Sequence, residues 1–168
     1  MTISMYQASA PYFIRMLKNL SAILDKAQAH ADANKIEHTV FTHDRLFPNM
    51  FALTKQVQIA TDSAKGAMAR LAGVDIPKFE DTEQTFGDLI ARVAKTIAFV
   101  ETFKPAQIDG TEEKEIVLKA GGQELKFTGM QFLLGFAYPN FYFHIATTYD
   151  ILRHRGVALG KMDFLGKA

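Results

Sequence analysis

The sequence contains no cysteine among its 168 residues, and it has little excess charge of either sign. The lack of cysteine excludes disulfides, thiolate metal sites and cysteine nucleophiles together. The 19 basic and 18 acidic residues leave a net charge of +1, and no two lysines or arginines are adjacent. A protein that binds nucleic acid usually concentrates positive charge on one face. We therefore expect no nucleic-acid partner.

Long hydrophobic runs are also absent. Apolar stretches such as Phe132–Pro139 are far shorter than the roughly 20 residues that cross a bilayer. The segment Met1–Gln7 lacks the charged region and apolar run of a signal peptide. These two absences lead us to expect no membrane partner and a cytoplasmic location.

Helical periodicity is what the sequence does contain. Apolar residues recur at spacings of three and four, which is the pattern of an amphipathic helix. This pattern predicts four long helices, which are Ser9–Asn34, Pro48–Ala72, Thr82–Phe103 and Gly129–Arg155. Gly73 is expected to end the second helix in a left-handed conformation. Asp81 is the predicted N-cap of the third helix, and Thr128 with Gln131 is the predicted capping box of the fourth.

The periodicity changes between the third and fourth helices. Residues 115–119 and 124–127 alternate polar and apolar side chains around a turn that contains Gly121-Gly122. Such glycines supply the positive φ angles of a tight hairpin. We expect a mainly α chain, a four-helix bundle with a small β-hairpin inserted between the third and fourth helices, forming one domain over residues 1–168.

The fourth predicted helix carries the most informative irregularity. Pro139 lies in its interior, removes a hydrogen bond to the carbonyl of Gly135 and favours a kink there. Asn140 and His144 follow at a spacing of four, on one face that overlaps the core stripe. His144 is therefore either a candidate catalytic residue in a pocket or a core histidine whose hydrogen bonds are satisfied.

The second predicted helix supplies candidate partners. Gln56 has apolar neighbours at spacings of three and four, so we expect it to point inward and meet His144 or Asn140. Gln58, Asp62 and Lys65 form a continuous polar stripe, which we interpret as a solvated face with an Asp–Lys pair. Asn140, Gln56, Gln58 and Asp62 are the candidate binding residues.

The segments Ser4–Ser9, Lys55–Ala60, Pro139–His144 and Asp163–Gly166 resemble, in the same order, those of an uncharacterised bacterial family. That family is a domain of unknown function in the DinB/YfiT-like superfamily. The resemblance implies a four-helix bundle, often a homodimer. It also implies a divalent metal such as nickel or zinc, held by one histidine of the second helix and an H-x-x-x-H pair of a later helix.

This sequence departs from that ligand pattern. His144 matches the second histidine of the pair, Asn140 stands at the first, and Gln56 or Gln58 lies near the position of the third. Neutral amides are poor ligands for nickel or zinc, so we expect no cofactor. If a metal is bound, we expect His144 and Asn140 to be its ligands. We expect a homodimeric, small-molecule-binding bundle with a degenerate metal site. The alternative is a divalent-metal-dependent transferase or isomerase acting on a small molecule, either thiol-linked or not.

Overall fold

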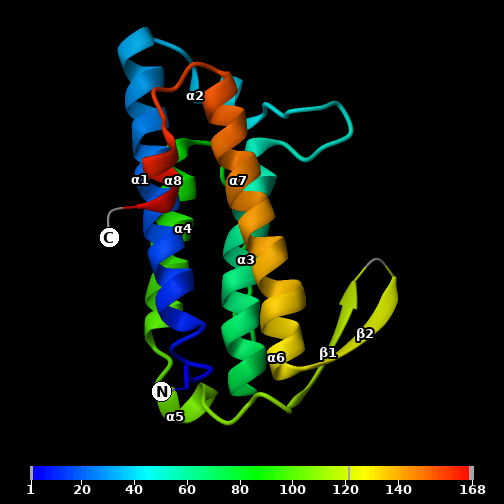
Figure 1. Ribbon diagram of the computed structural model, residues 1–168. Coiled ribbons are helices and arrows are strands. Elements are labelled where there is room, and N and C mark those ends of the chain that lie inside the picture. The colour runs from blue at the N-terminus through cyan, green and yellow to red at the C-terminus, as the bar shows by residue number, and fades with distance from the viewer. Residues whose placement is uncertain (1, 121, 167–168) are drawn as a thin grey trace.

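The computed structural model describes residues 2–120 and 122–166 of the chain. Four long helical segments and one two-stranded sheet account for most of it (Figure 1). In chain order the elements are α1 (Ala10–Asn34), α2 (His38–Thr42), α3 (Leu53–Ala72), α4 (Phe86–Glu101), α5 (Pro105–Ile108), β1 (Glu115–Ala120), β2 (Gln123–Thr128), α6 (Gly129–Phe132), the π-helix η1 (Leu133–Ala137), α7 (Tyr138–His154) and α8 (Lys161–Leu165).

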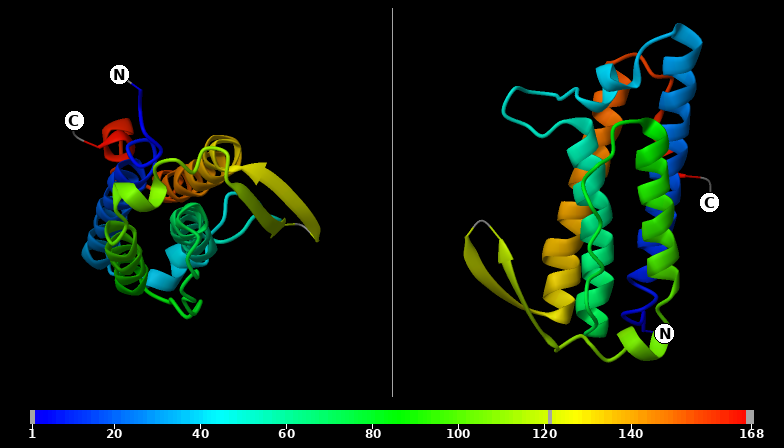
Figure 2. Two further views of the ribbon diagram at one scale, coloured as in Figure 1. Left: turned by 90° about the horizontal axis from the view of Figure 1, so that it is seen from below. Right: turned by 180° about the vertical axis from the view of Figure 1, so that it is seen from behind.

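The long helices pack side by side as a bundle, which confirms the predicted fold class. Helix α1 contacts α4, and α3 contacts both α4 and α7. Helices α3 and α4 run in the same direction, so the segment between them returns along the length of the bundle (Figures 1 and 2). We call this segment, residues 73–85, the crossover. Its course decides which face of α3 is exposed.

The core is built from the inward stripes of these helices. Phe13 on α1, Val57 on α3, Phe86 on α4 and Phe141 on α7 are all completely buried. Burial of a side chain of this size contributes roughly 1.5–3 kcal/mol relative to exposure. The periodic positions of the sequence therefore became the core, which is why the helix pattern predicted the fold.

Helix α4 begins later than predicted. Asp81 lies in the crossover, and the N-cap is Thr85, whose side chain accepts from the backbone N–H of Asp88 while the Asp88 carboxylate accepts from the Thr85 N–H. Asp81 and Thr85 both match the capping pattern, but only Thr85 is followed directly by the buried stripe of the helix. The prediction of Asp81 as the N-cap was wrong because its carboxylate binds Lys55 and Arg92 instead.

The predicted hairpin is present. Strands β1 and β2 pair antiparallel, with Glu115 opposite Thr128. Gly122 has φ +78°, as the turn requires, and Gly121 lies outside the described residues. The hairpin projects from the lower end of the bundle (Figure 1), and it is attached there by the buried side chains of Ile116 and Leu118.

The fourth helical segment is irregular where the sequence predicted a kink, and the irregularity is a π-helical turn. Residues Leu133–Ala137 form a π-helical turn in which the N–H of Tyr138 bonds to the carbonyl of Leu133. Proline cannot donate a helical hydrogen bond, and a π turn just before it is one way to accommodate the missing donor. Thr128 and Gln131 form the expected capping box at the start of α6.

The C-terminal segment docks on α1. The side chain of Asn19 donates to the carbonyl of Phe164 at 3.0 Å, and Lys26 binds Asp163 at 2.6 Å. In the described part of the chain, no helix combines the length and apolar character needed to cross a membrane.

Candidate functional site

The contact line between α3 and α7, which we call the seam, carries polar side chains in an otherwise apolar interface. Near its upper end, His144 Nδ1 lies 2.6 Å from Gln56 Oε1. Gln56 Nε2 in turn donates to the carbonyl oxygen of Phe51 at 3.0 Å. Gln56 and His144 are both buried, at 1 % and 7 % exposure. The predicted meeting of these two residues is therefore found.

The hydrogen bonds define the protonation state of this pair. A backbone carbonyl only accepts, so the amide nitrogen of Gln56 faces Phe51 and the amide oxygen faces the imidazole. Nδ1 of His144 must then carry the proton, which leaves Nε2 with a lone pair. Burial lowers the pKa of His144 from its usual value. The ring is a neutral, oriented imidazole, and among the described residues it does not line the cleft beside Asn140.

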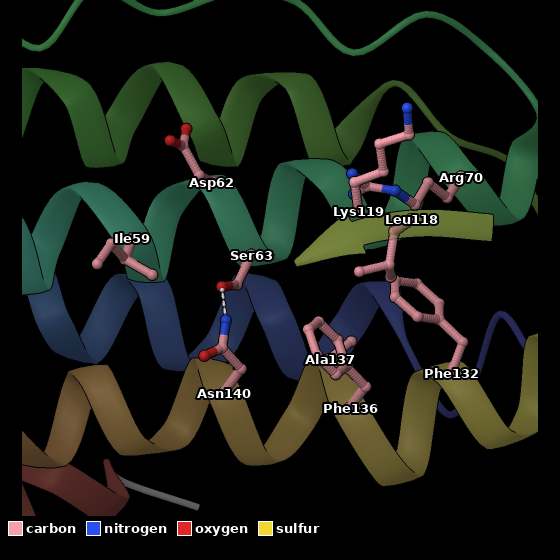
Figure 3. A pocket seen from close by; sticks show the side chains of 10 residues that line it. All are labelled: Ile59, Asp62, Ser63, Arg70, Leu118, Lys119, Phe132, Phe136, Ala137 and Asn140. Carbon is pink, nitrogen blue, oxygen red and sulfur yellow. Dashed lines mark hydrogen bonds between the residues drawn. The ribbon is translucent and has the colours of Figure 1, made fainter. Parts of the chain in front are cut away.

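A second polar contact lies further along the seam. Asn140 Nδ2 donates to Ser63 Oγ at 2.8 Å (Figure 3). Asn140 thus lies one turn from His144 but has a different partner, so the two do not converge on one point. Ser63 keeps its own hydroxyl hydrogen as a donor, and the Asn140 carbonyl oxygen remains an acceptor.

An open cleft of about 250 Å³ begins at this second contact. Its volume is slightly below the ~300–1,000 Å³ of typical ligand pockets. Phe132, Phe136 and Leu118 form an apolar wall, whereas Arg70 and Lys119 add positive charge (Figure 3). The remaining lining residues are Ile59, Asp62, Ser63, Ala137 and Asn140.

Gln58 and Asp62 do not lie on the side of α3 that faces His144 of α7. Gln58 Nε2 donates to Glu83 Oε2 at 2.8 Å, and Asp62 binds Arg92 at 3.1 Å. The predicted polar stripe is therefore only partly solvated, since Asp62 is exposed and forms the predicted Asp–Lys pair but Gln58 is buried. Lys65 is only 4 % exposed and binds Asp62 at 2.9 Å. The expectation of solvent exposure for Lys65 was wrong because the crossover covers this face of α3.

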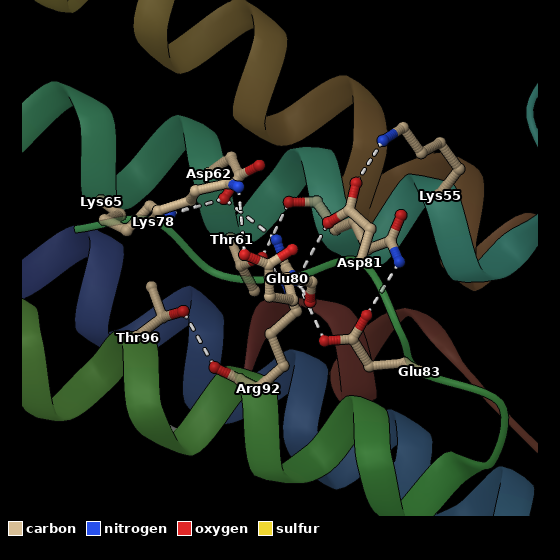
Figure 4. Close-up of polar contacts among 11 residues, drawn as sticks. Lys55, Thr61, Asp62, Lys65, Lys78, Glu80, Asp81, Glu83, Arg92 and Thr96 are labelled. Carbon is tan, nitrogen blue, oxygen red and sulfur yellow. Dashed lines mark hydrogen bonds and ion pairs between the residues drawn. The ribbon is translucent and has the colours of Figure 1, made fainter. Parts of the chain in front are cut away.

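Arg92 organises the covered face (Figure 4). Its guanidinium lies 3.1 Å from Asp62, 3.1 Å from Asp81 and 3.0 Å from Glu83, and its Nε donates to Thr61 at 2.8 Å. Burial alone would raise the pKa of Asp81, but the hydrogen bonds and charges of Lys55 and Arg92 outweigh it and lower that pKa. This network attaches the crossover to α3 and α4. Its positive and negative groups pair with one another.

Ser63 and Arg70 are the residues of the seam that the sequence analysis missed. They follow Gln56 at successive intervals of seven, so all three lie on one side of α3. The signal was present in the sequence. If Gln56 faces inward, the residues seven and fourteen positions later face the same way, and both of them are polar. It was hidden because the three residues share no chemical type.

The chain was compared with known proteins. The model of the DUF1993 family, a domain of unknown function, matches residues 5–165. The chain belongs to the DUF1993 family. A crystal structure of a DinB family member protein from Shewanella denitrificans is similar at 41 % identity and a TM-score of 0.87, with 97 % of this chain and 92 % of that chain covered. No curated protein matches the chain.

These similarities make the chain a DinB-like DUF1993 domain, as the resemblance indicated. The metal of that superfamily does not fit the residues found here. The donor set at the corresponding positions is one imidazole and two amides, and the Gln56 oxygen is already bonded to His144. Within residues 2–120 and 122–166, no three His, Cys, Asp or Glu side chains are grouped so as to hold a metal ion.

Proposed function

We propose that this DUF1993 domain is a small-molecule-binding bundle whose ligand occupies the cleft between α3, η1 and β1. The observation that carries this proposal is the composition of the cleft. Ser63, Asn140 and Arg70 present polar groups along one side, and Phe132 and Phe136 form the apolar wall. A concave, partly apolar site with a few oriented polar groups is the usual form of a ligand pocket.

The His144–Gln56 pair acts in this proposal as a positioning element. It closes the upper end of the seam and connects, through Gln56, to the loop at Phe51. In the proposal this pair is the remnant of a degenerate metal site. Its neutral imidazole keeps a basic Nε2, but no substrate group is placed against it, so we assign His144 no catalytic step.

The alternative function is that of a metal-dependent transferase or isomerase. Elemental analysis of protein purified without a histidine tag separates the two. We expect nickel, zinc, manganese and iron well below one equivalent, because one histidine and two amides are a weak donor set. Near-stoichiometric metal that is lost in His144→Ala would contradict our proposal and favour the alternative.

Binding itself is tested by filling the cleft. Ala137 lines it, so Ala137→Leu places three extra carbons in the open space. We expect that compounds which raise the melting temperature of the wild type in a small-molecule screen no longer do so with this variant. Ala22→Leu, on the exposed side of α1, is the matched control and should retain the shifts. A screen without any hit, or hits that survive Ala137→Leu, would refute the cleft as the binding site.

We also propose that the protein is a cytoplasmic homodimer without nucleic-acid or membrane partners. The net charge of +1 and the absence of adjacent basic residues argue against nucleic acid. The loop between α2 and α3 projects from the bundle (Figures 1 and 2) and exposes Leu46, Phe47 and Phe51 at 42 %, 61 % and 57 %. Exposed apolar side chains grouped in this way are typical of an interface, and a second copy of the chain is the partner we propose.

A further inference from the structure

The seam has three polar positions on α3, and the third differs from the other two. Gln56 is bonded to His144, and Ser63 is bonded to Asn140. Arg70 follows at the same interval, but no hydrogen bond or ion pair of its guanidinium is found among the described residues. In place of a side chain from α7, the cleft lies beside it.

Other cations that are at least half-buried in the described chain have partners. Arg92 binds three carboxylates, Lys65 binds Asp62, and Lys114 Nζ donates to the carbonyl of Leu71 at 2.8 Å. Burial of Arg70 lowers its pKa, with desolvation as the cause. Its guanidinium nevertheless stays protonated at neutral pH, because arginine deprotonates only in strong base. The partial loss of hydration is thus not compensated by any of the described residues.

The backbone of α3 is adapted to this guanidinium. A Cβ atom at Gly66 would lie 2.5 Å from Arg70 Nη1, so only glycine lets the guanidinium rest against the helix. Glycine inside a helix costs about 1 kcal/mol relative to alanine. The Arg70 side chain also points back along α3 toward Ser63 rather than toward the end of the helix (Figure 3), so its purpose is not to interact with the carbonyl groups of the last turn.

The charge around Arg70 favours an anion. Lys119 of β1 lines the same cleft, which places two cations there. The acidic lining residue, Asp62, is already bound to Lys65 and Arg92. Its carboxylate points toward α4 in Figure 3, away from the Ser63–Asn140 contact. Arginine is well suited to such a site, since its planar fork matches a carboxylate or phosphate group in two parallel hydrogen bonds.

One wall of the cleft is apolar and aromatic. Phe132 and Phe136 stack with ring centroids 6.0 Å apart and an interplanar angle of 20°, and Phe127 packs against both. Leu118 and Ala137 complete this wall. The volume of about 250 Å³ admits a small molecule only.

We propose that the cleft binds a small amphipathic anion, with its carboxylate or phosphate group on Arg70 and its aryl or short alkyl body on Phe132 and Phe136. The Ser63 hydroxyl donates a further hydrogen bond to the anion, and Lys119 contributes charge at the rim. This inference rests on the proposed function, since it names the ligand class of the same cleft.

The test is a titration of ¹⁵N-labelled protein with three probes that share one body, 3-phenylpropanoate, 3-phenylpropyl phosphate and neutral 3-phenylpropanol, each to 20 mM. We expect at least one anion to shift the amide signals of α3, η1 and β1 saturably, with an affinity at least tenfold above that of the alcohol. The stronger of the two anions identifies the headgroup. In Arg70→Met the affinity for that anion should fall at least tenfold, while Arg45→Met, on the exposed loop, should leave it unchanged.

Gly66→Ala is a second variant that retains the arginine but displaces its guanidinium, and it should lose the anion as Arg70→Met does. The outcomes separate the two proposals. If the alcohol binds as well as the anions and Arg70→Met changes nothing, the anion inference is wrong while the cleft remains a binding site. If no probe shifts any of these amides, the anion inference is refuted. The proposed function is judged separately by the compound screen.

Discussion

Gly66 lies in the middle of α3, where glycine weakens a helix, and the reason for its presence is the neighbouring guanidinium. The atom that a new Cβ would meet is Arg70 Nη1, at 2.5 Å. This atom is the end of a long, flexible side chain, so it can move away at low cost. A substitution at Gly66 can therefore change the position of the Arg70 guanidinium without destabilising the helix.

Gly66→Ala should accordingly leave the protein as stable as the wild type or more stable by up to about 1 kcal/mol, because alanine favours the helix. It should also weaken the binding of aryl anions. Urea unfolding measures the first effect and NMR titration the second. Gly135→Ala is the control, since nothing lies within 4 Å of its added Cβ and Arg70 stays in place. A large loss of stability in Gly66→Ala would show that the guanidinium cannot move.

His144 is a residue whose protonation state affects stability. Burial lowers its pKa in the folded state below the usual value of 6.5. Above that value the ring is neutral in both states and contributes no pH dependence. As the pH falls through 6.5, the unfolded chain takes up a proton first, so the free energy of unfolding decreases until the folded state is protonated too.

We expect this decrease to be smaller in His144→Asn. Its amide nitrogen can replace Nδ1 as the donor to Gln56, but it does not titrate. The measurement is the free energy of unfolding from urea denaturation at half-unit steps between pH 8 and pH 5, for wild type and variant. Parallel pH profiles of the two proteins would mean that His144 is charged as readily in the folded as in the unfolded state.

At the scale of elements, the crossover determines which face of α3 is covered. It places Phe79 between two cations, with Lys65 Nζ 3.9 Å and Lys95 Nζ 4.1 Å from the ring centroid. It also brings Asp81 and Glu83 to the buried guanidinium of Arg92. The crossover is thus held by charge pairs and cation–π contacts rather than by an apolar stripe.

Arg92→Met should therefore destabilise the protein by about 3 kcal/mol, because removing one partner of a buried charge network leaves the others uncompensated. We place the effect at the lower end of the usual range because Asp62 and Asp81 are 47 % and 40 % exposed. Urea unfolding measures it. Lys18→Met, whose pair with Glu101 spans 3.8 Å at the surface, is the control and should stay within about 0.5 kcal/mol of the wild type. Equal stability of both variants would mean that the network contributes little.

The junction between the hairpin and α6 is a second element with a strict requirement. A Cβ at Gly129 would lie 2.0 Å from the backbone oxygen of Thr111, and backbone cannot move as easily as the end of a side chain. Gly129→Ala should cost about 1–3 kcal/mol, the usual range for overpacking. Thermal unfolding compares it with Gly87→Ala, where the nearest atom is an ordinary 3.7 Å away. A melting temperature of Gly129→Ala equal to that of the control would contradict the close approach.

At the scale of the whole molecule, self-association is proposed to depend on the projecting loop. We expect Phe47→Ser combined with Phe51→Ser to convert a dimer into a monomer, because these changes remove most of the apolar surface exposed there. The Gln56 contact is preserved, since it uses the backbone oxygen of Phe51. Sedimentation velocity at about 50 μM provides the measurement. Val40→Ser, at the similarly exposed site on α2, is the control and should remain dimeric. A monomeric wild type would refute the proposal.

The sequence by itself determined the helices, the hairpin and the inward position of Gln56. Each follows from periodicity, from glycines at turns or from the neighbours within one helix, and these are local properties of the chain. His144 and Asn140 were found for the same reason, since they share one face of a predicted helix. The choice of Thr85 over Asp81 as the N-cap already needed more, because both fit the local pattern.

Only the tertiary structure decided what each polar residue does. It buried Lys65, paired Asp62 with Arg92 and paired Gln58 with Glu83, because the crossover returns along α3. No local pattern specifies that course. It also left Arg70 beside an open cleft while the equivalent positions on the seam found partners. Whether a polar side chain becomes a structural contact or a binding group depends on which distant segment lies opposite it, and that is a property of the packed molecule.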